Sequence, residues 1–479
     1  MYIDKIRFLG VSLLLSFCIS SQADIRLPAF FSDRMVLQQE TGANIWGWVA
    51  TNQEVKVSFA GQTESVKADK DGKWKITLRG LKSSNKGAEL TITAGGETKK
   101  INDVVVGEVW IASGQSNMEW IVAKSTSREA ASLAEDDLLR VYVSKNVTAE
   151  RELTNFPGSW MLTKPDQTLK FTAVGYEFAK SLRERLDIPV GIIECAWGGK
   201  PVESFISEEA LKVLPESKFV LDRKAIAKKN WRKGTKNNPD LNAGFHSTIY
   251  NGMIAPIAGY SARGAIWYQG ESNANRGTDT IYGELLECLI QDWRKRWDSN
   301  LSFYYVQLAN FNRGNNSSWV NVQDEMRRLL DDDNMQAGNI GMATINDIGH
   351  PTDIHPTNKK DVGERLARWA LSQDYGIKNI VISGPLYKSH ELKGDKIEIS
   401  FDHAQGLKSR DGEALGSFEV AGDDGKWVPA KAVISGDKIL VHSAEVKAPI
   451  HARYAWLSFP KDANLVNGEG LPTSCFITK

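Results

Sequence analysis

The chain has 479 residues, more than a single hydrophobic core usually organises, so two or three domains are expected. Lys and Arg together number 59, and so do Asp and Glu, which leaves a formal net charge of zero. A neutral chain has no overall field to attract nucleic acid or an anionic membrane, and 42% hydrophobic with 25% charged residues is typical of a soluble globular protein.

The first 23 residues have the layout of a secretory signal. Lys5 and Arg7 precede an apolar run over residues 8–19, and the segment 21–23 (Ser-Gln-Ala) offers a small-x-small cleavage site. The apolar run is too short to cross a bilayer, and no later run replaces it. We therefore predict an exported protein, periplasmic or extracellular after cleavage, with no membrane insertion.

Three cysteines, Cys195, Cys288 and Cys475, remain after such a cleavage. An odd number predicts at least one free thiol and at most one disulfide. Cys195 lies in the apolar stretch 192–196, which is typical of a buried, unreactive thiol. No group of Cys and His residues has the spacing of a metal site, so we expect neither a metal nor another cofactor.

Residues 24–103 show the alternation of polar and apolar residues that is typical of strands with one buried face. Asp71-Gly72 and Gly95-Gly96 mark tight turns between these strands. The region is predicted to form a small antiparallel sandwich-like domain. The alternating apolar residues are Val55, Val57 and Phe59, then Trp74, Ile76 and Leu78, then Leu90 and Ile92.

Residues 104–374 differ, because apolar strand-like runs alternate with helical stretches. This alternation predicts right-handed β-α-β units on a parallel sheet, in which functional sites gather at the carboxyl ends of the strands. The expected strands are 104–112, 189–196, 262–268, 301–309 and 340–345, and the expected helices are 171–186, 282–297, 320–332 and 359–372.

Residues 375–479 return to strand-like alternation, so a C-terminal β-rich domain is predicted. The sequence leaves open whether it packs against the N-terminal β region. The four residues 424–427 (Asp-Gly-Lys-Trp) repeat residues 71–74, which indicates the same turn-then-strand solution used twice. The alternating apolar residues are Ile397 and Ile399, then Ile439 and Val441.

A first candidate for chemistry is Ser116, in the segment 114–118 (Gly-Gln-Ser-Asn-Met) directly after the apolar run 109–112. At the junction of a strand and a helix, a serine hydroxyl lies at the edge of the sheet, and its N–H faces the place where an oxyanion would develop. Met118 stands where a nucleophile elbow has its second glycine, so this is not the α/β-hydrolase motif. The alternative is an ordinary helix N-cap.

A second candidate is His355, within the segment 353–356 (Asp-Ile-His-Pro) between an expected strand and an expected helix. A serine hydrolase needs an imidazole to take the hydroxyl proton and a carboxylate to hold that imidazole. His355 beside Asp353 supplies both groups. The alternative is a purely structural histidine.

Two further segments also follow expected strands. Gln269, in the segment 267–273, presents a side-chain amide that could donate to an oxyanion, and the pair Gly198-Gly199 permits a backbone N–H to approach a ligand closely. Taken alone, the first is also typical of a polar loop and the second of an ordinary turn. Because the carboxyl ends of parallel strands meet at one edge, all four segments are expected to converge on one site, which favours an enzyme.

These segments resemble the sialate O-acetylesterase family of SGNH hydrolases. The resemblance covers nearly the whole chain after residue 23, in order, and the Gln-Gly-Glu-Ser-Asn and Gly-Gln-Ser-Asn-Met segments together are specific. It implies an SGNH-type three-layer α/β/α domain flanked by β regions, and a carbohydrate O-acetylesterase. The matching segments are residues 31–38, 114–118, 197–199, 250–254, 266–273 and 354–359.

The resemblance implies Ser116 as the nucleophile and His355 as the general base. The N–H groups of Ser116 and Gly199 and the side chain of Gln269 would form the oxyanion hole, with Gln269 where many SGNH enzymes have Asn. Glu271 is expected to pair with a basic group beneath the site or to orient the loop of Ser116.

The acid of the triad is open. Many SGNH hydrolases have Asp three residues before the histidine, a position that Thr352 occupies here. Asp353 is the preferred candidate, Asp347 is the substitute, and a Ser-His pair helped by a backbone carbonyl is the third option. Asn251 is expected to support the site without taking part in the chemistry.

Several aromatic and histidine residues have two interpretations. Trp120, Trp267 and Tyr268 either contact sugar or pack in the core, and His246 either contacts substrate or is structural. The 15 Trp residues of the chain likewise either fill large β cores or line a sugar site.

O-acetylated sialic acid is the substrate that the resemblance implies, and acetylated xylan, mannan or pectin is the alternative. A sialate needs a cation for its carboxylate, for which Lys200, Arg263 and Arg313 are candidates. A carbohydrate-binding protein without catalysis is the alternative of another class, which the presence of Ser116 and His355 disfavours. The sequence does not indicate an oligomeric state.

Overall fold

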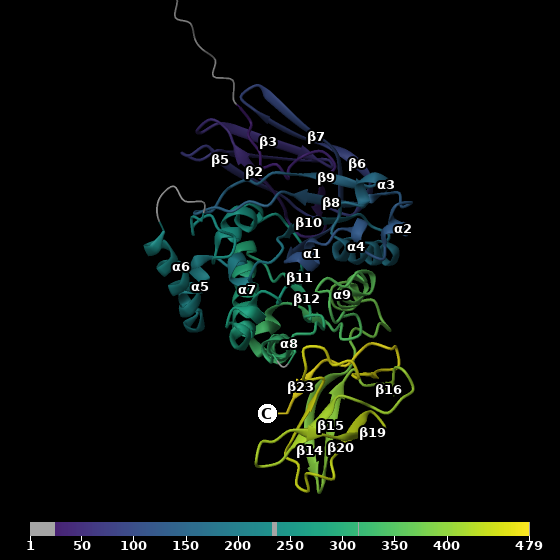
Figure 1. Ribbon diagram of the computed structural model, residues 1–479. Helices are drawn as coiled ribbons and strands as arrows, with labels where there is room; N and C mark the ends of the chain where they lie inside the picture. The colour runs from purple at the N-terminus through teal and green to yellow at the C-terminus, as the bar shows by residue number, and fades with distance from the viewer. Residues whose placement is uncertain (1–23, 232–236, 315, 479) are drawn as a thin grey trace, which may run out of the picture.

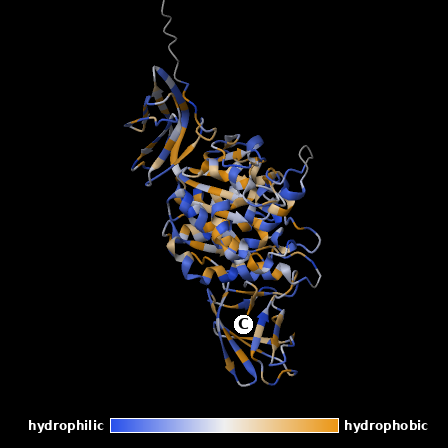
Figure 2. Cartoon of the chain, turned by 90° about the vertical axis from the view of Figure 1, so that its left-hand side faces the viewer, coloured by the Kyte–Doolittle hydropathy of each residue, from blue (hydrophilic) through white to orange (hydrophobic). Residues whose placement is uncertain are grey.

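The computed structural model describes residues 24–231, 237–314 and 316–478. The signal-like segment 1–23, with Cys18, lies outside the described residues. N-terminal strands, a helix-rich central part and C-terminal sheets follow one another along the long axis of the molecule (Figure 1). A view turned by 90° shows the two β regions at opposite ends of the central part (Figure 2), so they do not pack together.

The N-terminal region is built of short, mostly antiparallel strands, as its alternation predicted. β3 pairs with β4 and β6, and β2 pairs with β5, all antiparallel. Along β3 the apolar residues are buried and the others are not, which is the pattern of a sheet with one solvent-exposed face. The strands are β1 (Val36–Gln38), β2 (Ala43–Trp48), β3 (Glu54–Phe59), β4 (Gln62–Lys67), β5 (Lys73–Leu78) and β6 (Ser84–Ala94).

A single strand, β7 (Glu97–Gly114), belongs both to this region and to the central sheet. Its first part pairs antiparallel with β6, and its second part pairs parallel with β10 and β11. The strand bends at Asp103, where the register with β6 shifts and φ is +55°. The expected domain boundary between residues 103 and 104 therefore falls inside one continuous strand.

The central sheet has the strand order β13-β12-β11-β7-β10-β8-β9. Its strands are parallel, as predicted, except for the edge strand β9, which pairs antiparallel with β8. β8 and β9 were not expected from the sequence. The strands are β8 (Asp136–Ser144), β9 (Gly158–Thr163), β10 (Val190–Ala196), β11 (Gly264–Tyr268), β12 (Ser302–Val306) and β13 (Ile340–Ala343).

Helices cover both faces of this sheet, which confirms the three-layer prediction. Alternate residues of β7 face opposite cores: Trp110 packs with α4 and α9, whereas Ile111 belongs to the core that contains α7 and α8. The four helices are α4 (Ala173–Leu186), α7 (Tyr282–Trp297), α8 (Ser318–Arg328) and α9 (Lys360–Gln373), all close to their predicted bounds. The other α-helices of the described residues are α1 (Ser116–Glu119), α2 (Arg128–Ala131), α3 (Pro165–Thr168), α5 (Glu208–Val213) and α6 (Lys218–Asn230).

The C-terminal region is antiparallel and has its own core, in which all four predicted alternating residues are buried. Of the two Asp-Gly-Lys-Trp segments, both have a left-handed glycine, but only the first leads straight into a six-residue strand. The strands are β14 (Leu386–Lys393), β15 (Lys396–Asp402), β16 (Lys408–Ser409), β17 (Phe418–Ala421), β18 (Val428–Pro429), β19 (Lys431–Ser435), β20 (Lys438–His442), β21 (His451–Tyr454), β22 (Leu465–Val466) and β23 (Phe476–Ile477).

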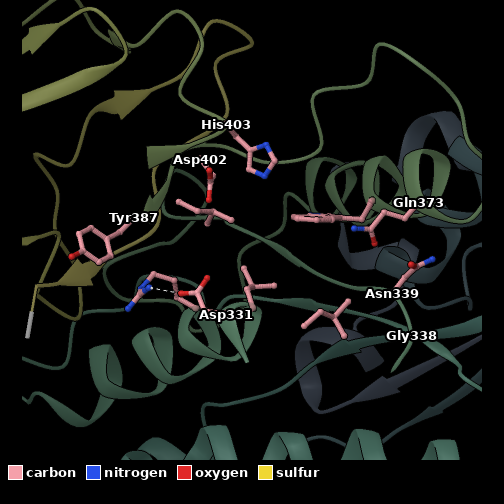
Figure 3. A pocket seen from close by; sticks show the side chains of 12 residues that line it. Asp331, Gly338, Asn339, Gln373, Tyr387, Asp402 and His403 are labelled. Carbon is pink, nitrogen blue, oxygen red and sulfur yellow. Dashed lines mark ion pairs between the residues drawn. The ribbon is translucent and has the colours of Figure 1, made fainter. Parts of the chain in front are cut away.

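A polar pocket of about 430 Å³ lies between the central part and the C-terminal sheets. Figure 3 shows Asp402 and His403 from the C-terminal side facing Asn339 and Gln373 from the central side. Because Asn339 directly precedes β13, this pocket lies at the amino end of the strands, away from the edge where the sequence placed the candidate residues.

Cys195, Cys288 and Cys475 are all free, and burial raises the pKa of the Cys195 thiol far above its ordinary value, as expected of an unreactive thiol. Among the described residues, no helix is both long enough and apolar enough to span a bilayer.

Candidate active site

Ser116 begins helix α1, two residues after β7 ends at Gly114. Gly114 has a φ of +135°, and a Cβ there would lie 2.2 Å from the carbonyl oxygen of Tyr268, at the end of the neighbouring strand β11. Only glycine permits that approach. The sequence thus brings the carboxyl ends of β7 and β11 together, with the half-buried Ser116 directly above them.

His355 reaches Ser116 from the loop between β13 and α9. Its Nε2 lies 2.8 Å from the Ser116 Oγ, within hydrogen-bonding distance. The indole of Trp120 stacks on the imidazole, with centroids 4.8 Å apart and an angle of 16°, so Trp120 fixes the plane of the ring. The two residues that the sequence singled out as nucleophile and base are therefore in contact.

The pKa of His355 is lowered from its ordinary value. Burial is the largest cause, because it disfavours the charged ring, and the positive charges of Lys359 and Lys124 act in the same direction. Asp353 opposes them. The imidazole is therefore neutral at neutral pH, which is the form that accepts a proton.

Asp353 lies beside His355 but does not hydrogen-bond its ring. Its Oδ1 accepts the backbone N–H of His355 at 2.8 Å, whereas the distance from Oδ1 to Nδ1 is 3.8 Å. The carboxylate is 54% exposed. Asp347, the substitute, is held by Arg365 through two contacts of 2.7 Å and is committed to that pair.

The turn at Gly198-Gly199 follows β10 and lies against Ser116. A Cβ on Gly198 would be 3.3 Å from the Ser116 Cβ, and the Gly198 N–H donates to Glu119 Oε2 at 2.7 Å. Gly199 has a φ of +69°, is exposed, and has open space where its Cβ would be. Glu119 was not foreseen, although it lies one helical turn after Ser116.

Glu194, at the end of β10, is a second carboxyl group close to this turn. Burial, and then the neighbouring charge of Glu119, raise the pKa of Glu194 to about 8. Glu194 is therefore largely protonated at neutral pH.

Gln269 is fully buried directly after β11, and its amide is engaged internally. Its Nε2 lies 2.7 Å from Asn273 Oδ1, 3.1 Å from Gln115 Oε1 and 3.2 Å from the Lys200 carbonyl oxygen. Its Oε1 accepts the hydroxyl of Tyr282 at 2.8 Å. Gln269 thus holds the residue that precedes Ser116, and its role as an oxyanion donor stays a prediction.

A buried chain of three polar side chains joins the two catalytic loops from below. Asn117 donates to Glu271 Oε1 at 2.5 Å and to the carbonyl oxygen of Ile354 at 3.0 Å, and its own Oδ1 accepts a hydrogen bond from Lys359 Nζ. Ile354 precedes His355, so Asn117 ties the nucleophile's helix to the loop of the base. Glu271 accepts a hydrogen bond from the residue that follows Ser116, which agrees with a role in orienting that loop, and it feels the charge of Lys359 without a direct ion pair among the described residues.

The pKa values of Glu271 and Lys359 are shifted because both side chains are buried. Burial lowers the pKa of Lys359 to about 7, against the opposing attraction of Glu271, and burial raises the pKa of Glu271. The contributions of Asn117 and Lys359 were missed by the sequence analysis, although both residues lie inside the segments that carried the resemblance.

The remaining aromatic and polar candidates are structural. Trp267 and Tyr268 are fully buried in the two cores, so the suggestion that they contact sugar is wrong. Asn251 donates to the carbonyl oxygens of Ala149 and Glu150 at 3.2 and 2.9 Å and holds that loop. His246 is 4% exposed, and burial lowers its pKa to about 4.

Two of the three proposed cations are already engaged. Arg263 binds both oxygens of the buried Glu108 at 2.8 and 2.9 Å, and Arg313 donates to Asn275. Lys200 lies with its Nζ 5.8 Å from the centre of the Trp197 ring, beside the glycine turn. Within residues 24–231, 237–314 and 316–478, no group of three or more His, Cys, Asp or Glu side chains is arranged to hold a metal.

This arrangement can perform nucleophilic acyl transfer. A serine hydroxyl bonded to a neutral imidazole, at a strand end flanked by a glycine turn, provides a nucleophile, a base and nearby backbone donors.

Comparison with known proteins points the same way. Residues 106–372 match the model of a family described as carbohydrate esterase, sialic acid-specific acetylesterase. The chain is 28% identical to the sialate O-acetylesterase of Rattus norvegicus, over 91% of the chain and 90% of the relative. It is also 28% identical to that of Homo sapiens, over 92% and 89%.

A solved structure shares the whole fold. A carbohydrate acetylesterase from Xanthomonas citri superposes with a TM-score of 0.84 at 35% identity, covering 95% of this chain and 99% of that one.

Proposed function

Because the chain belongs to the sialic acid-specific acetylesterase family of carbohydrate esterases, and is thus a carboxylic ester hydrolase, we propose that it removes O-acetyl groups from sialic acids with Ser116 as its nucleophile. The observation that carries the proposal is the 2.8 Å contact between Ser116 Oγ and His355 Nε2 at the carboxyl end of β7.

The reaction would proceed in two steps. Ser116 Oγ attacks the acetyl carbonyl carbon while His355 Nε2 takes the hydroxyl proton; the C–O bond to the sugar then breaks, and the sugar oxygen leaves with that proton. Water next attacks the acetyl-enzyme, again giving its proton to His355, and acetate leaves as Ser116 regains its hydrogen. His355 suits both roles because it is neutral at rest.

The oxyanion hole would use the N–H groups of Ser116 and Gly199. The contact between Glu119 and the Gly198 N–H supports this assignment, because it fixes the turn that presents Gly199 beside Ser116. Gln269 is the proposed third donor, which requires one of its N–H groups to turn from its internal acceptor towards the oxyanion. Losing one such donor costs about 3 kcal/mol in the barrier.

Asp353 is the proposed acid of the site. It acts through its charge and its hold on the His355 backbone, and a rotation that closes the 3.8 Å gap to Nδ1 would add a direct hydrogen bond. Its negative charge favours the imidazolium that forms during each step.

The second candidate substrate is an acetylated plant polysaccharide such as xylan, mannan or pectin. One observation keeps it in play: the relative that shares 35% identity with this chain is described as a carbohydrate acetylesterase, a description that is not restricted to sialic acids. Both candidates use the same chemistry at Ser116.

Export is also proposed, to the periplasm or the medium, on the strength of the signal-like layout of residues 1–23. Amino-terminal sequencing of the protein recovered outside the cytoplasm should begin at Asp24. Recovery of the uncleaved chain from the cytoplasm alone would reject export.

The deciding experiment measures acetate released from 9-O-acetylated sialic acid and from acetylated xylan by the mature protein and by Ser116→Ala. We expect release from the sialic acid that the variant abolishes. Release from xylan alone would keep Ser116 and reject the sialate substrate. Equal release by both proteins would reject Ser116, and binding without release would favour a non-catalytic carbohydrate-binding protein.

A further inference from the structure

A hollow of about 360 Å³ opens on the N-terminal region where β2 and β5 lie side by side. Three tryptophans line it, Trp46, Trp48 and Trp74, and its far wall is formed by Ala258 and Gly259 of the central part. The sequence analysis left open whether tryptophans of this chain line a sugar site. These three tryptophans lie together in a surface hollow and take no part in the active site.

The register of the two strands fixes which side chains share the outer face. Trp46 lies opposite Lys75, and Trp48 lies opposite Lys73. Because side chains alternate along a strand, these four residues point to the same side, while Trp74 points to the core. Two half-buried indoles and two exposed lysines therefore stand together on one face.

The two outer tryptophans differ in their aromatic contacts. Trp46 packs against Phe30 and Phe31, with ring centroids 5.4 and 4.7 Å away, and these contacts hold its ring in place. Trp48 is half-buried and stacks on no other aromatic ring in the described part of the chain. Trp48 is therefore the less constrained of the two rings, and it is partly exposed in the hollow.

The rim of the hollow carries an excess of positive charge, because two lysines and one aspartate line it. Neither Lys73 nor Lys75 has an ion-pair partner among residues 24–231, 237–314 and 316–478. Asp69 also lines the hollow, and its Oδ1 accepts the backbone N–H groups of Asp71 and Lys73 at 2.9 and 2.8 Å in the turn. Its negative charge offsets one of the two lysines and leaves an excess of one positive charge. In a chain of zero net charge, this local excess selects an anion.

We propose that this surface, the Trp48 groove (Trp46, Trp48, Lys73, Lys75 and Gly259), binds an acidic glycan. A sugar ring has an apolar face of C–H groups and a polar rim, so it would lie on the Trp48 indole, and its carboxylate would meet Lys73 and Lys75. The ligand class is a carboxylate-bearing saccharide, either a sialic acid or a uronic acid.

The Trp48 groove is separate from the active site. Gly259 lies before the amino end of β11, whereas Gln269 follows the carboxyl end of the same strand. A glycan bound there cannot place the same sugar at Ser116. The groove would instead hold one part of an acidic polymer while another part is deacetylated, and its binding is independent of which ester the enzyme cleaves.

The test measures binding to Ser116→Ala, so that no substrate is consumed, by calorimetry with three probes: an α2,8-linked oligosialic acid, an oligogalacturonate and xylohexaose. We expect one of the two acidic probes to bind and xylohexaose to bind more weakly. Trp48→Ala should weaken binding about tenfold, and Lys73→Gln with Lys75→Gln about fivefold. Added salt should weaken binding further.

Matched variants separate the groove from general effects. Lys56→Gln with Lys67→Gln removes the same charge from exposed positions on β3 and β4, and Trp427→Ala removes an indole from the C-terminal region; both should bind as the parent does. The proposal fails if neither acidic probe binds, if the control pair weakens binding equally, or if xylohexaose binds as tightly. If Trp48→Ala melts early, the lysine pair alone decides.

Discussion

At the scale of single residues, Asn117 controls how Ser116 and His355 meet. Asn117→Ala removes its bonds to Glu271 and to the Ile354 carbonyl, so the loop of His355 loses its tie to the helix of Ser116. We expect kcat on 4-nitrophenyl acetate to fall about a hundredfold, because a misplacement of about 1 Å has that effect, while KM changes little. An unchanged kcat in a folded variant would show that the tie is not needed.

The acid limb of the pH profile reports His355. Only the neutral ring acts as a base, so kcat/KM should rise with pH through the His355 pKa, and that pKa lies below 6.5. Asp353 raises this pKa, so Asp353→Asn should move the limb to still lower pH while reducing the plateau. A limb that moves upward in this variant would contradict the assigned electrostatics.

His246 makes stability depend on pH. Its pKa is about 4 in the folded chain and about 6.5 when unfolded, so the unfolded state binds more protons at low pH. The contribution is complete above about pH 6.5 and is lost as pH falls towards 4, amounting to about 3 kcal/mol. Urea unfolding of the parent and of His246→Gln between pH 4 and 7 gives the free energy of unfolding at each pH. This free energy should change less steeply with pH in the variant.

At the scale of elements, the glycine turn after β10 depends on the short helix α1. Glu119→Ala frees the Gly198 N–H and should lower kcat about tenfold, whereas Glu119→Gln, which keeps an acceptor oxygen, should lose much less. The comparison of the two variants, with thermal melting as a check on folding, isolates the positioning of the turn. Equal losses would show that charge matters and position does not.

The bend in β7 depends on Arg140 of β8. Its buried guanidinium donates to the carbonyl oxygens of Arg34, Asp103 and Asp137 and so holds the strand where it passes between regions. Arg140→Met should lower the free energy of unfolding by about 3 kcal/mol, since these carbonyls lose a charged donor. Denaturation in urea, with Arg128→Met on exposed α2 as the control, measures this.

The helices and strands differ in how well the sequence predicted them. The helices predicted over residues 171–186, 282–297 and 359–372 lie within two residues of their observed bounds, because each has a regular apolar face. β8 was missed because it starts with Asp-Asp-Leu-Leu-Arg, and the burial of this arginine depends in part on the carbonyl groups of Arg34 and Asp103, which are far away in the sequence. Such partners come from tertiary structure, and no local pattern contains them.

The same distinction holds in the active site. Ser116 and His355 were found because each lies in a segment of specific composition. Glu119, Asn117 and Lys359 were missed as positioning residues because their roles depend on contacts across 79 to 242 positions of the chain. The hydrogen bonds from Gln269 to Gln115 and Asn273 likewise could not be read from the sequence, because they depend on the folded structure.

At the scale of the whole molecule, the C-terminal region is bound to the catalytic part through its last strands. Gln307 Nε2 donates to Ser474 at 2.7 Å, and Asn346 donates to the Thr473 carbonyl oxygen at 2.8 Å. The segment that ends the chain therefore braces β12 and the loop after β13, on which His355 depends.

The shared strand β7 has a consequence for synthesis of the chain. A ribosome releases the N-terminal strands first, and these can pair as soon as residue 106 has emerged. The rest of β7, apolar on both faces, must wait for β10 at residue 196 and for β11 at residue 268 before its edges are covered. During that interval the nascent chain exposes an unpaired apolar strand, so its yield should depend on chaperone capacity and on translation rate between these positions.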